Sequence, residues 1–307
     1  MPDAAQPPKK APGKEPKSKS DAPAKPPGSK PDLSTLAGIA VALAGILGGL
    51  LLEKGKIQDV AQTTAAMIVL GGTFGAVLVT TPLPVFLRAC KGLANAFLEQ
   101  ASSIPATIDS LIRYATQARK NGIVSLETEA AGIADPFLRK ALNLAVDGTD
   151  LQEIRKMMEL DINLGELAGE AEAKVWEAAG GYAPTIGIIG AVMGLIQVMK
   201  HLEDIKEVGH GIAVAFVATV YGVGSANIFF LPVANKLRAR MRDAILLKDM
   251  TLEGIIGIVE GLNPTLIRAK LEAYNQQPAK PAQPKTAKPA AAGAKKSPAP
   301  QPASARS

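Results

Sequence analysis

Two apolar runs, Pro184 to Lys200 and Gly211 to Val233, most constrain what this chain can fold into. Neither run has a charged side chain in its interior, and each is close to the ~20 residues that a helix needs to cross ~30 Å of hydrocarbon. A short charged turn, His201 to His210, joins them. The pattern predicts a membrane hairpin of two helices.

Two earlier apolar runs predict a second hairpin. Leu33 to Leu52 follows Asp32, whose carboxylate can accept from the free N–H groups at a helix start, and Thr63 to Thr81 ends before Pro82. Glycines four residues apart allow close approach of helices in lipid, so two such pairs are predicted to pack against other helices: Gly45 with Gly49, and Gly190 with Gly194.

Between the hairpins, residues 88–180 are expected to form a compact helical domain without strands. The apolar residues recur at helical spacing, and starts and stops are punctuated by proline, glycine and capping residues. We expect starts at Pro105, at Asp135 with Pro136, and at Thr149, which forms a capping box with Gln152; we expect stops at Asn121 with Gly122 and at Gly148.

Composition separates the ends of the chain from its middle. Residues 1–31 and 276–307 consist largely of Lys, Pro and Ala and are predicted to be disordered tails. The net charge is +6, but aromatic residues make up only 4%, so membrane lipid is a better partner than nucleic acid. Trp176 is expected to anchor at the membrane surface and Cys90 to be a small buried side chain.

Basic residues near the span ends indicate which side of the membrane each segment occupies. Arg88 and Lys91 follow the second span, and Lys236 with three arginines follows the fourth. These span ends are therefore expected on the cytoplasmic side of the membrane. The sequence predicts an all-α integral membrane protein with four transmembrane helices, a helical cytoplasmic domain between helices 2 and 3, and both termini cytoplasmic. The expected parts are hairpin 1 (32–87), the domain 88–180, hairpin 2 (181–233) and C-terminal cytoplasmic helices (234–275).

No catalytic, metal-binding or phosphate-binding pattern stands out, so the chain is not expected to be an enzyme or to hold a cofactor. The spans contain no carboxylate, although an ion path through hydrocarbon normally needs an ionisable group at depth. Spans 3 and 4 offer small residues and a few neutral polar ones, Thr185, Thr219, Tyr221, Ser225 and Asn227. If the chain conducts ions, a partner must supply the acid.

Seven stretches carry a resemblance to a known family: residues 68–73 (IVLGGT), 118–127 (ARKNG through LE), 135–140 (DPFLRK), 146–150 (VDGTD), 178–194, 211–237 and 260–264 (EGLNP). On these stretches, and from Leu33 to Tyr274 as a whole, the sequence resembles the MotA/PomA family, the larger subunit of the bacterial flagellar stator.

This resemblance implies a multi-pass protein of the bacterial inner membrane that forms a homo-pentamer around a dimer of MotB-like subunits. Those subunits would supply the membrane aspartate, and proton flow would drive torque on a rotor protein of the FliG type. Arg119 and Glu127 correspond to the family's rotor-facing charges.

The resemblance also implies roles within the spans. Pro184 and Pro232 match prolines linked to helix movement, and Thr219 matches the threonine that faces the partner's aspartate. Tyr221 belongs to the same expected channel-lining or gating set. Sodium-driven relatives commonly carry threonine where this chain has Ala191, which favours protons as the transported ion.

Three alternatives remain at this stage. The first is an ExbB/TolQ-like energiser of envelope transport, although those relatives generally have three spans. The second is a sodium-driven, PomA-like stator. The third is a membrane scaffold that conducts nothing.

Overall fold

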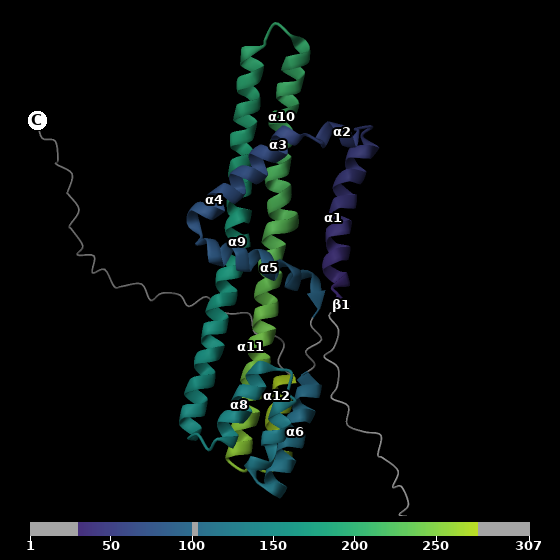
Figure 1. Ribbon diagram of the computed structural model, residues 1–307. Coiled ribbons are helices and arrows are strands. Elements are labelled where there is room, and N and C mark those ends of the chain that lie inside the picture. Colours follow the sequence, from purple (N-terminus) through teal and green to yellow (C-terminus); the bar gives the residue numbers. More distant parts are fainter. Residues whose placement is uncertain (1–29, 100–103, 276–307) are drawn as a thin grey trace, which may run out of the picture. The chain divides into compact units, whose positions relative to one another are not determined.

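A computed structural model of the protein describes residues 30–99 and 104–275, all within the first of the chain's two units, Met1–Gln276 (Figure 1). Helices account for nearly all of these residues, so the all-α prediction is confirmed. The tails predicted to be disordered lie outside the described residues, except for Lys30 and Pro31. In chain order the elements are β1 (Lys30–Pro31), α1 (Leu33–Leu52), α2 (Ile57–Val60), α3 (Thr63–Ala66), the π-helical turn η1 (Met67–Gly71), α4 (Gly72–Thr80), α5 (Leu83–Phe97), β2 (Leu98–Glu99), α6 (Ile104–Asn121), the 3₁₀ turn η2 (Ile123–Leu126), α7 (Glu127–Ala131), α8 (Pro136–Val146), α9 (Leu151–Lys200), α10 (Ile205–Gly224), the π-helical turn η3 (Ser225–Phe230), α11 (Leu231–Val259) and α12 (Pro264–Asn275).

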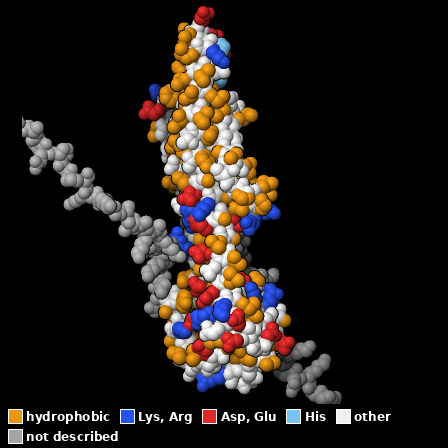
Figure 2. All heavy atoms as spheres, turned by 90° about the vertical axis from the view of Figure 1, so that its left-hand side faces the viewer, with side chains coloured by type: hydrophobic (Ala, Val, Ile, Leu, Met, Phe, Trp, Pro, Cys, Tyr) orange, Lys and Arg blue, Asp and Glu red, His pale blue; other side chains and the backbone are white. Residues whose placement is uncertain are grey.

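Four helical stretches of the described chain are long and apolar enough to cross a membrane, as expected. They are Leu33–Leu52, Ile57–Thr80 and the apolar parts of Leu151–Lys200 and Ile205–Val259. Figure 2 shows hydrophobic side chains covering the part of the surface formed by these stretches, and charged side chains gathered over the helices at the other end.

The third and fourth spans do not end where the charged domain begins. α9 is one helix of 50 residues, and α10, η3 and α11 run on without a break from Ile205 to Val259. Figure 1 shows these two long helices side by side. The sequence boundary expected near residue 181 is therefore not a break in the backbone, because one face of each helix stays packed on the other along its length.

Three hydrophobic cores in the described residues hold these long helices, and the smallest joins Ala65 and Val69 to Val217 and Ala218. The first lies in the charged end, where α6, α8 and α12 pack around the ends of α9 and α11 through side chains such as Leu111, Leu142 and Ile255. The second lies where α4 and α5 meet α9 and α11, and it centres on Trp176 and Phe230. Residues 88–180 thus share a hydrophobic core with the C-terminal helices and do not form a separate domain.

The expectation of no strands was wrong in one place. Lys30–Pro31 pairs antiparallel with Leu98–Glu99, and the backbone N–H of Asp32 donates to the carbonyl of Phe97 at 2.8 Å. The pairing forms because the chain leading into α1 runs beside the end of α5, where each can satisfy the other's free backbone groups.

The start of α9 also differs from the expected capping box at Thr149. The cap is Asp150, which accepts a hydrogen bond from the N–H of Gln152 at 2.9 Å. The N–H of Thr149 instead donates to the carbonyl of Leu144, next to Gly148 at φ 73°. Thr149 therefore completes the C-terminal turn of α8 and cannot also begin α9.

Two side chains lie elsewhere than expected. Trp176 is buried, its Nε1 donates to the carbonyl of Ala89 at 3.3 Å, and its ring stacks on Phe230. It holds helices together rather than anchoring at the membrane surface. Cys90 is exposed, because it falls on the outer face of the amphipathic helix α5.

Candidate functional site

The contact between α9 and α10 is made by glycines. A Cβ at Gly187 would lie 2.9 Å from the carbonyl oxygen of Ala218, and one at Gly194 would lie 2.7 Å from the carbonyl oxygen of Gly211. Gly222, on α10, similarly faces the backbone of Ala183 at 2.6 Å. The two backbones touch along this line, so any side chain there would push the helices apart.

Ala191 and Thr219 lie on the same side of this helix pair. Gly190 faces the Cβ of Ala218, and each of the two predicted residues is the next one along its helix. One residue turns a helix by about 100°, and in an antiparallel pair the two turns carry both side chains to the same side. Both residues are half-buried, so this face is left partly open by the described chain.

This open face carries little polarity of its own. The Thr219 hydroxyl donates to the carbonyl of Ala215 in its own helix at 3.3 Å, and Ala191 adds only a methyl group. The hydroxyl oxygen still has lone pairs to offer a ligand.

Tyr221 points away from that face. Its hydroxyl donates to the carbonyl of Val60 at 2.5 Å and accepts from the N–H of Gln62 at 3.3 Å. Two residues along a helix turn by about 200°, which explains why Tyr221 and Thr219 face different neighbours. The structure therefore does not bring Tyr221 together with Ala191 and Thr219; it places Tyr221 against the connection between α2 and α3.

The two predicted prolines lie inside continuous helices, at about the same height along the two long helices. Pro184 is within α9 and leaves the carbonyl of Gly180 without its helical donor. Gly180 contacts the side chain of Leu231, the residue before Pro232. The π-helical turn η3 ends one residue earlier, at Phe230. A weakened turn in α9 thus faces a weakened turn in the other long helix.

Beyond this level, an ion-pair cluster ties α9 to α11. The Arg238 guanidinium donates to both carboxylate oxygens of Glu170, at 3.1–3.3 Å, and to Glu177. The bond from Arg238 lowers the pKa of Glu177, and the bonds to Glu177 and Glu170 raise the pKa of Arg238. Sequence reasoning missed this cluster, although the two acids are seven residues apart and so share a face of the helix.

Arg119 and Glu127 are both exposed on the charged end, and neither makes an ion pair within the described residues. Arg119 is in the last turn of α6 and Glu127 begins α7, on either side of Gly122 at φ 82°. The positive φ suits glycine and lets the chain reverse there. Two charges of opposite sign, without an ion pair among the described residues, are thus exposed on α6 and α7, with η2 between them.

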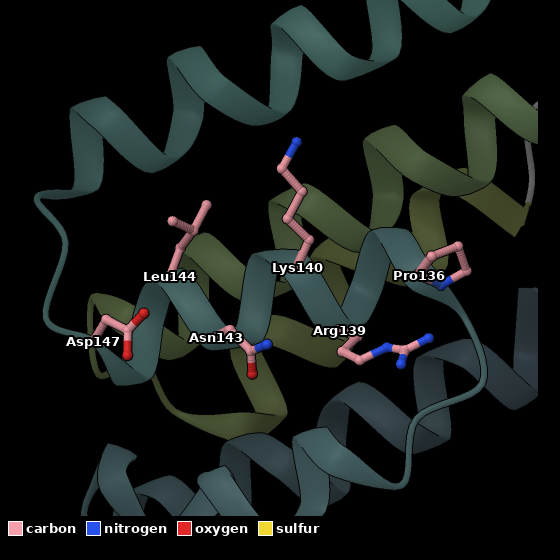
Figure 3. Close-up of a pocket in the computed structure, with 6 residues that line it drawn as sticks. All are labelled: Pro136, Arg139, Lys140, Asn143, Leu144 and Asp147. Atoms are coloured by element: carbon pink, nitrogen blue, oxygen red, sulfur yellow. The ribbon is translucent and has the colours of Figure 1, made fainter.

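A shallow hollow of about 320 Å³ lies on α8 (Figure 3). Lys140 extends from it toward α9, where its Nζ bonds the Oδ2 of Asp161 at 2.9 Å, and this bond lowers the pKa of Asp161. The residues that line the hollow include no nucleophile beside a base: Pro136, Arg139, Lys140, Asn143, Leu144 and Asp147. It is a charged surface rather than a catalytic pocket.

The two predicted glycine pairs have different surroundings. Gly190 and Gly194 meet α10, whereas a Cβ at Gly45 or Gly49 would meet nothing within 4 Å in the described chain. α1 therefore presents its glycine face outward.

Four apolar helices, two of which run on into a charged helical domain, define a multi-pass helical membrane protein. Residues 129–250 match the MotA/TolQ/ExbB proton channel family, and residues 36–122 match the N-terminal part of motility protein A.

Individual relatives match along most of their length. Motility protein A of Helicobacter pylori is 37% identical over 243 residues, which are 79% of this chain and 95% of that protein. The solved structure of C. jejuni MotAB matches with a TM-score of 0.76 and 32% identity, over 82% of this chain and 100% of that chain. The flagellar MotAB stator complex from Bacillus subtilis matches with a TM-score of 0.74 and 33% identity, over 79% and 96%. The chain belongs to the MotA family of flagellar stator proteins, within the MotA/TolQ/ExbB proton channel family.

Proposed function

We propose that this chain is the larger subunit of a flagellar motor stator, which joins a MotB-like partner to form an ion channel and converts proton motive force into torque. The observation that carries the proposal is the open, charge-free face at Ala191 and Thr219 in a protein whose spans contain no carboxylate. A partner helix that brings one aspartate to this face completes an ion path.

Protons are the ion that this face suits. A hard cation such as sodium needs several oxygen ligands, and Ala191 supplies none where a threonine would add one. Swimming speed should fall with a proton uncoupler and stay constant as sodium is varied. A speed that follows sodium concentration would overturn the choice of ion.

The proposed arrangement has both termini, residues 88–180 and residues 234–275 on the cytoplasmic side of the bacterial inner membrane. Cys90 is the single cysteine of the chain and is exposed, so it serves as a reporter. A membrane-impermeant maleimide should label it in inverted vesicles and not in intact spheroplasts. Labelling in the spheroplasts would reverse the orientation.

In the assembly, we place five copies around a dimer of the partner, each with the face at Thr219 inward. Ion passage then moves the long helices, and the weakened turns at Pro184 and Pro232 are the places where they bend. The Arg238 cluster transmits this movement to the charged end, where Arg119 and Glu127 engage a rotor protein of the FliG type. The mass of the purified complex tests the stoichiometry.

Co-expression with the MotB-like partner should restore swimming to a cell that lacks its own stator. Replacing the partner's aspartate by asparagine should abolish proton flux in reconstituted complexes while assembly persists. Failure to swim despite membrane insertion and complex assembly would refute the proposed function.

A further inference from the structure

α1 lies apart from the helices that follow it in the sequence. None of its 20 residues is buried by other parts of the described chain. Two hollows of about 370 and 570 Å³ separate it from η3 and α11, and they adjoin because both are lined by Ser34 and Lys236.

The two hollows differ in the polarity of their lining residues. The smaller one runs along α1 past Gly38 and Ile39 to Ala42 and has Ile228 and Val233 on its other wall. From Ser34 to Ala42 a helix rises about 12 Å, somewhat less than half of the ~30 Å hydrocarbon thickness. This length accommodates most of an acyl chain of one leaflet.

The larger hollow, at the charged end of the span, is lined by Asp32, Lys236, Arg240 and Asp243. Asp32 is fully engaged: its Oδ2 lies 2.5 Å from the Lys236 ammonium and 2.8 Å from the Arg240 guanidinium, and its Oδ1 caps α1.

Two groups in this hollow still lack partners. The Nε of Arg240 is buried with no hydrogen-bond acceptor among the described residues, and Asp243 is exposed with no ion pair among them. The Arg240 and Lys236 side chains are partly exposed, so a ligand in the hollow can bring an anionic oxygen to them. The same ligand can bring a cation to Asp243.

We propose that the space between α1 and α11 binds a zwitterionic phospholipid of the phosphatidylethanolamine type. Its phosphate contacts Arg240 and Lys236, its ammonium contacts Asp243, and one acyl chain fills the hollow beside Gly38. Two cations and two carboxylates around the head group sum to zero charge, which matches a zwitterion better than an anionic lipid. The proposal requires the membrane spans only and does not depend on ion conduction.

The test is native mass spectrometry of the full chain, co-purified with its partner subunit from vesicles that contain equal amounts of phosphatidylethanolamine and phosphatidylglycerol. The wild-type complex should retain phosphatidylethanolamine. Asp243→Asn should lower the ratio of retained phosphatidylethanolamine to retained phosphatidylglycerol roughly tenfold, which is the effect of losing one charge-assisted hydrogen bond. Arg242→Gln is the matched control, because Arg242 is exposed on the same helix and lies outside both hollows.

The acyl-chain end is tested separately. A Cβ at Gly38 has open space around it, so Gly38→Leu fills the hollow without a clash and should displace the lipid. Gly48→Leu, equally open on the same helix but outside the hollow, should not. Free phosphoethanolamine, which lacks acyl chains, should not compete for the site.

Three results would overturn the proposal. The first is preferential retention of phosphatidylglycerol or of neither lipid by the wild-type complex. The second is an unchanged lipid ratio in Asp243→Asn. The third is equal loss of the lipid in Gly38→Leu and Gly48→Leu, which would show that the hollow beside Gly38 does not hold the acyl chain.

Discussion

The close approach of α9 and α10 can be tested by adding one methyl group at Gly194. A Cβ there would lie 2.7 Å from the carbonyl oxygen of Gly211 and 2.8 Å from the backbone N of Ala215. Ordinary contact begins near 3.4 Å, and backbone atoms cannot rotate out of the way. The helices must therefore separate by about 0.7 Å, and overpacking of this kind costs about 1–3 kcal/mol.

Gly209→Ala is the matched control. Gly209 lies on α10, the other helix of the same hairpin, and a Cβ there would meet nothing within 4 Å. Both substitutions gain about the same helix propensity, up to ~1 kcal/mol, so the difference between their melting temperatures reports the clash alone. Gly194→Ala should melt roughly 5 °C below Gly209→Ala. The fluorescence of the single tryptophan, Trp176, which is buried between α9 and its neighbours, reports the transition.

Equal melting temperatures for the two variants would refute the argument that backbone contact at Gly194 holds the hairpin together. A higher melting temperature for Gly194→Ala would do so more strongly, because the added methyl group would then improve the packing of the two helices instead of forcing them apart.

Three further predictions concern the charged end. Reversing Arg119 or Glu127, by Arg119→Glu or Glu127→Lys, should reduce the torque of tethered cells while complex assembly stays intact, and normal swimming by both variants would leave them as solvated surface charges. Arg238→Gln should lower the free energy of unfolding by about 2 kcal/mol, because two carboxylates of α9 lose a charged donor; an unchanged unfolding midpoint in denaturant would contradict this. Asp249→Asn should raise the melting temperature at pH 7, since burial, with neighbouring acids, raises the pKa of Asp249 and its charge is costly there. This gain should shrink as the pH falls toward the raised pKa, where the wild-type carboxyl takes up a proton, and a constant gain down to pH 4 would count against the mechanism.

Local chemistry along the chain was enough to predict most of the helices. Twenty uncharged residues after Asp32 have few alternatives to a span, and the carboxylate of Asp32 does accept from the N–H groups of Ser34 and Thr35. The stops at Gly122 and Gly148 were likewise predictable, because both adopt a positive φ that glycine tolerates best. These features depend on neighbours within a few residues, and the sequence shows such neighbours directly.

Local patterns misled where a residue's role depended on distant segments. Thr149 and Gln152 have the spacing of a capping box, yet Thr149 is used by the preceding helix. Trp176 stands near an apolar run, but contacts with Ala89 and Phe230 bury it. Pairing of Lys30–Pro31 with Leu98–Glu99 joins segments nearly 70 residues apart, and nothing in their composition marks them as strands.

In the candidate site, too, some features follow from the sequence alone and others only from contacts between distant segments. The absence of a carboxylate from every span is a property of the amino-acid sequence, and it already required that any acid for an ion path come from another chain. Which polar side chain of α10 lies on the open face is a matter of rotation about the helix axis, and only the contact of Gly190 with Ala218 decides it. That contact directs Ala191 and Thr219 to the open face and Tyr221 to Val60, because two helices in backbone contact can be rotated in only one way.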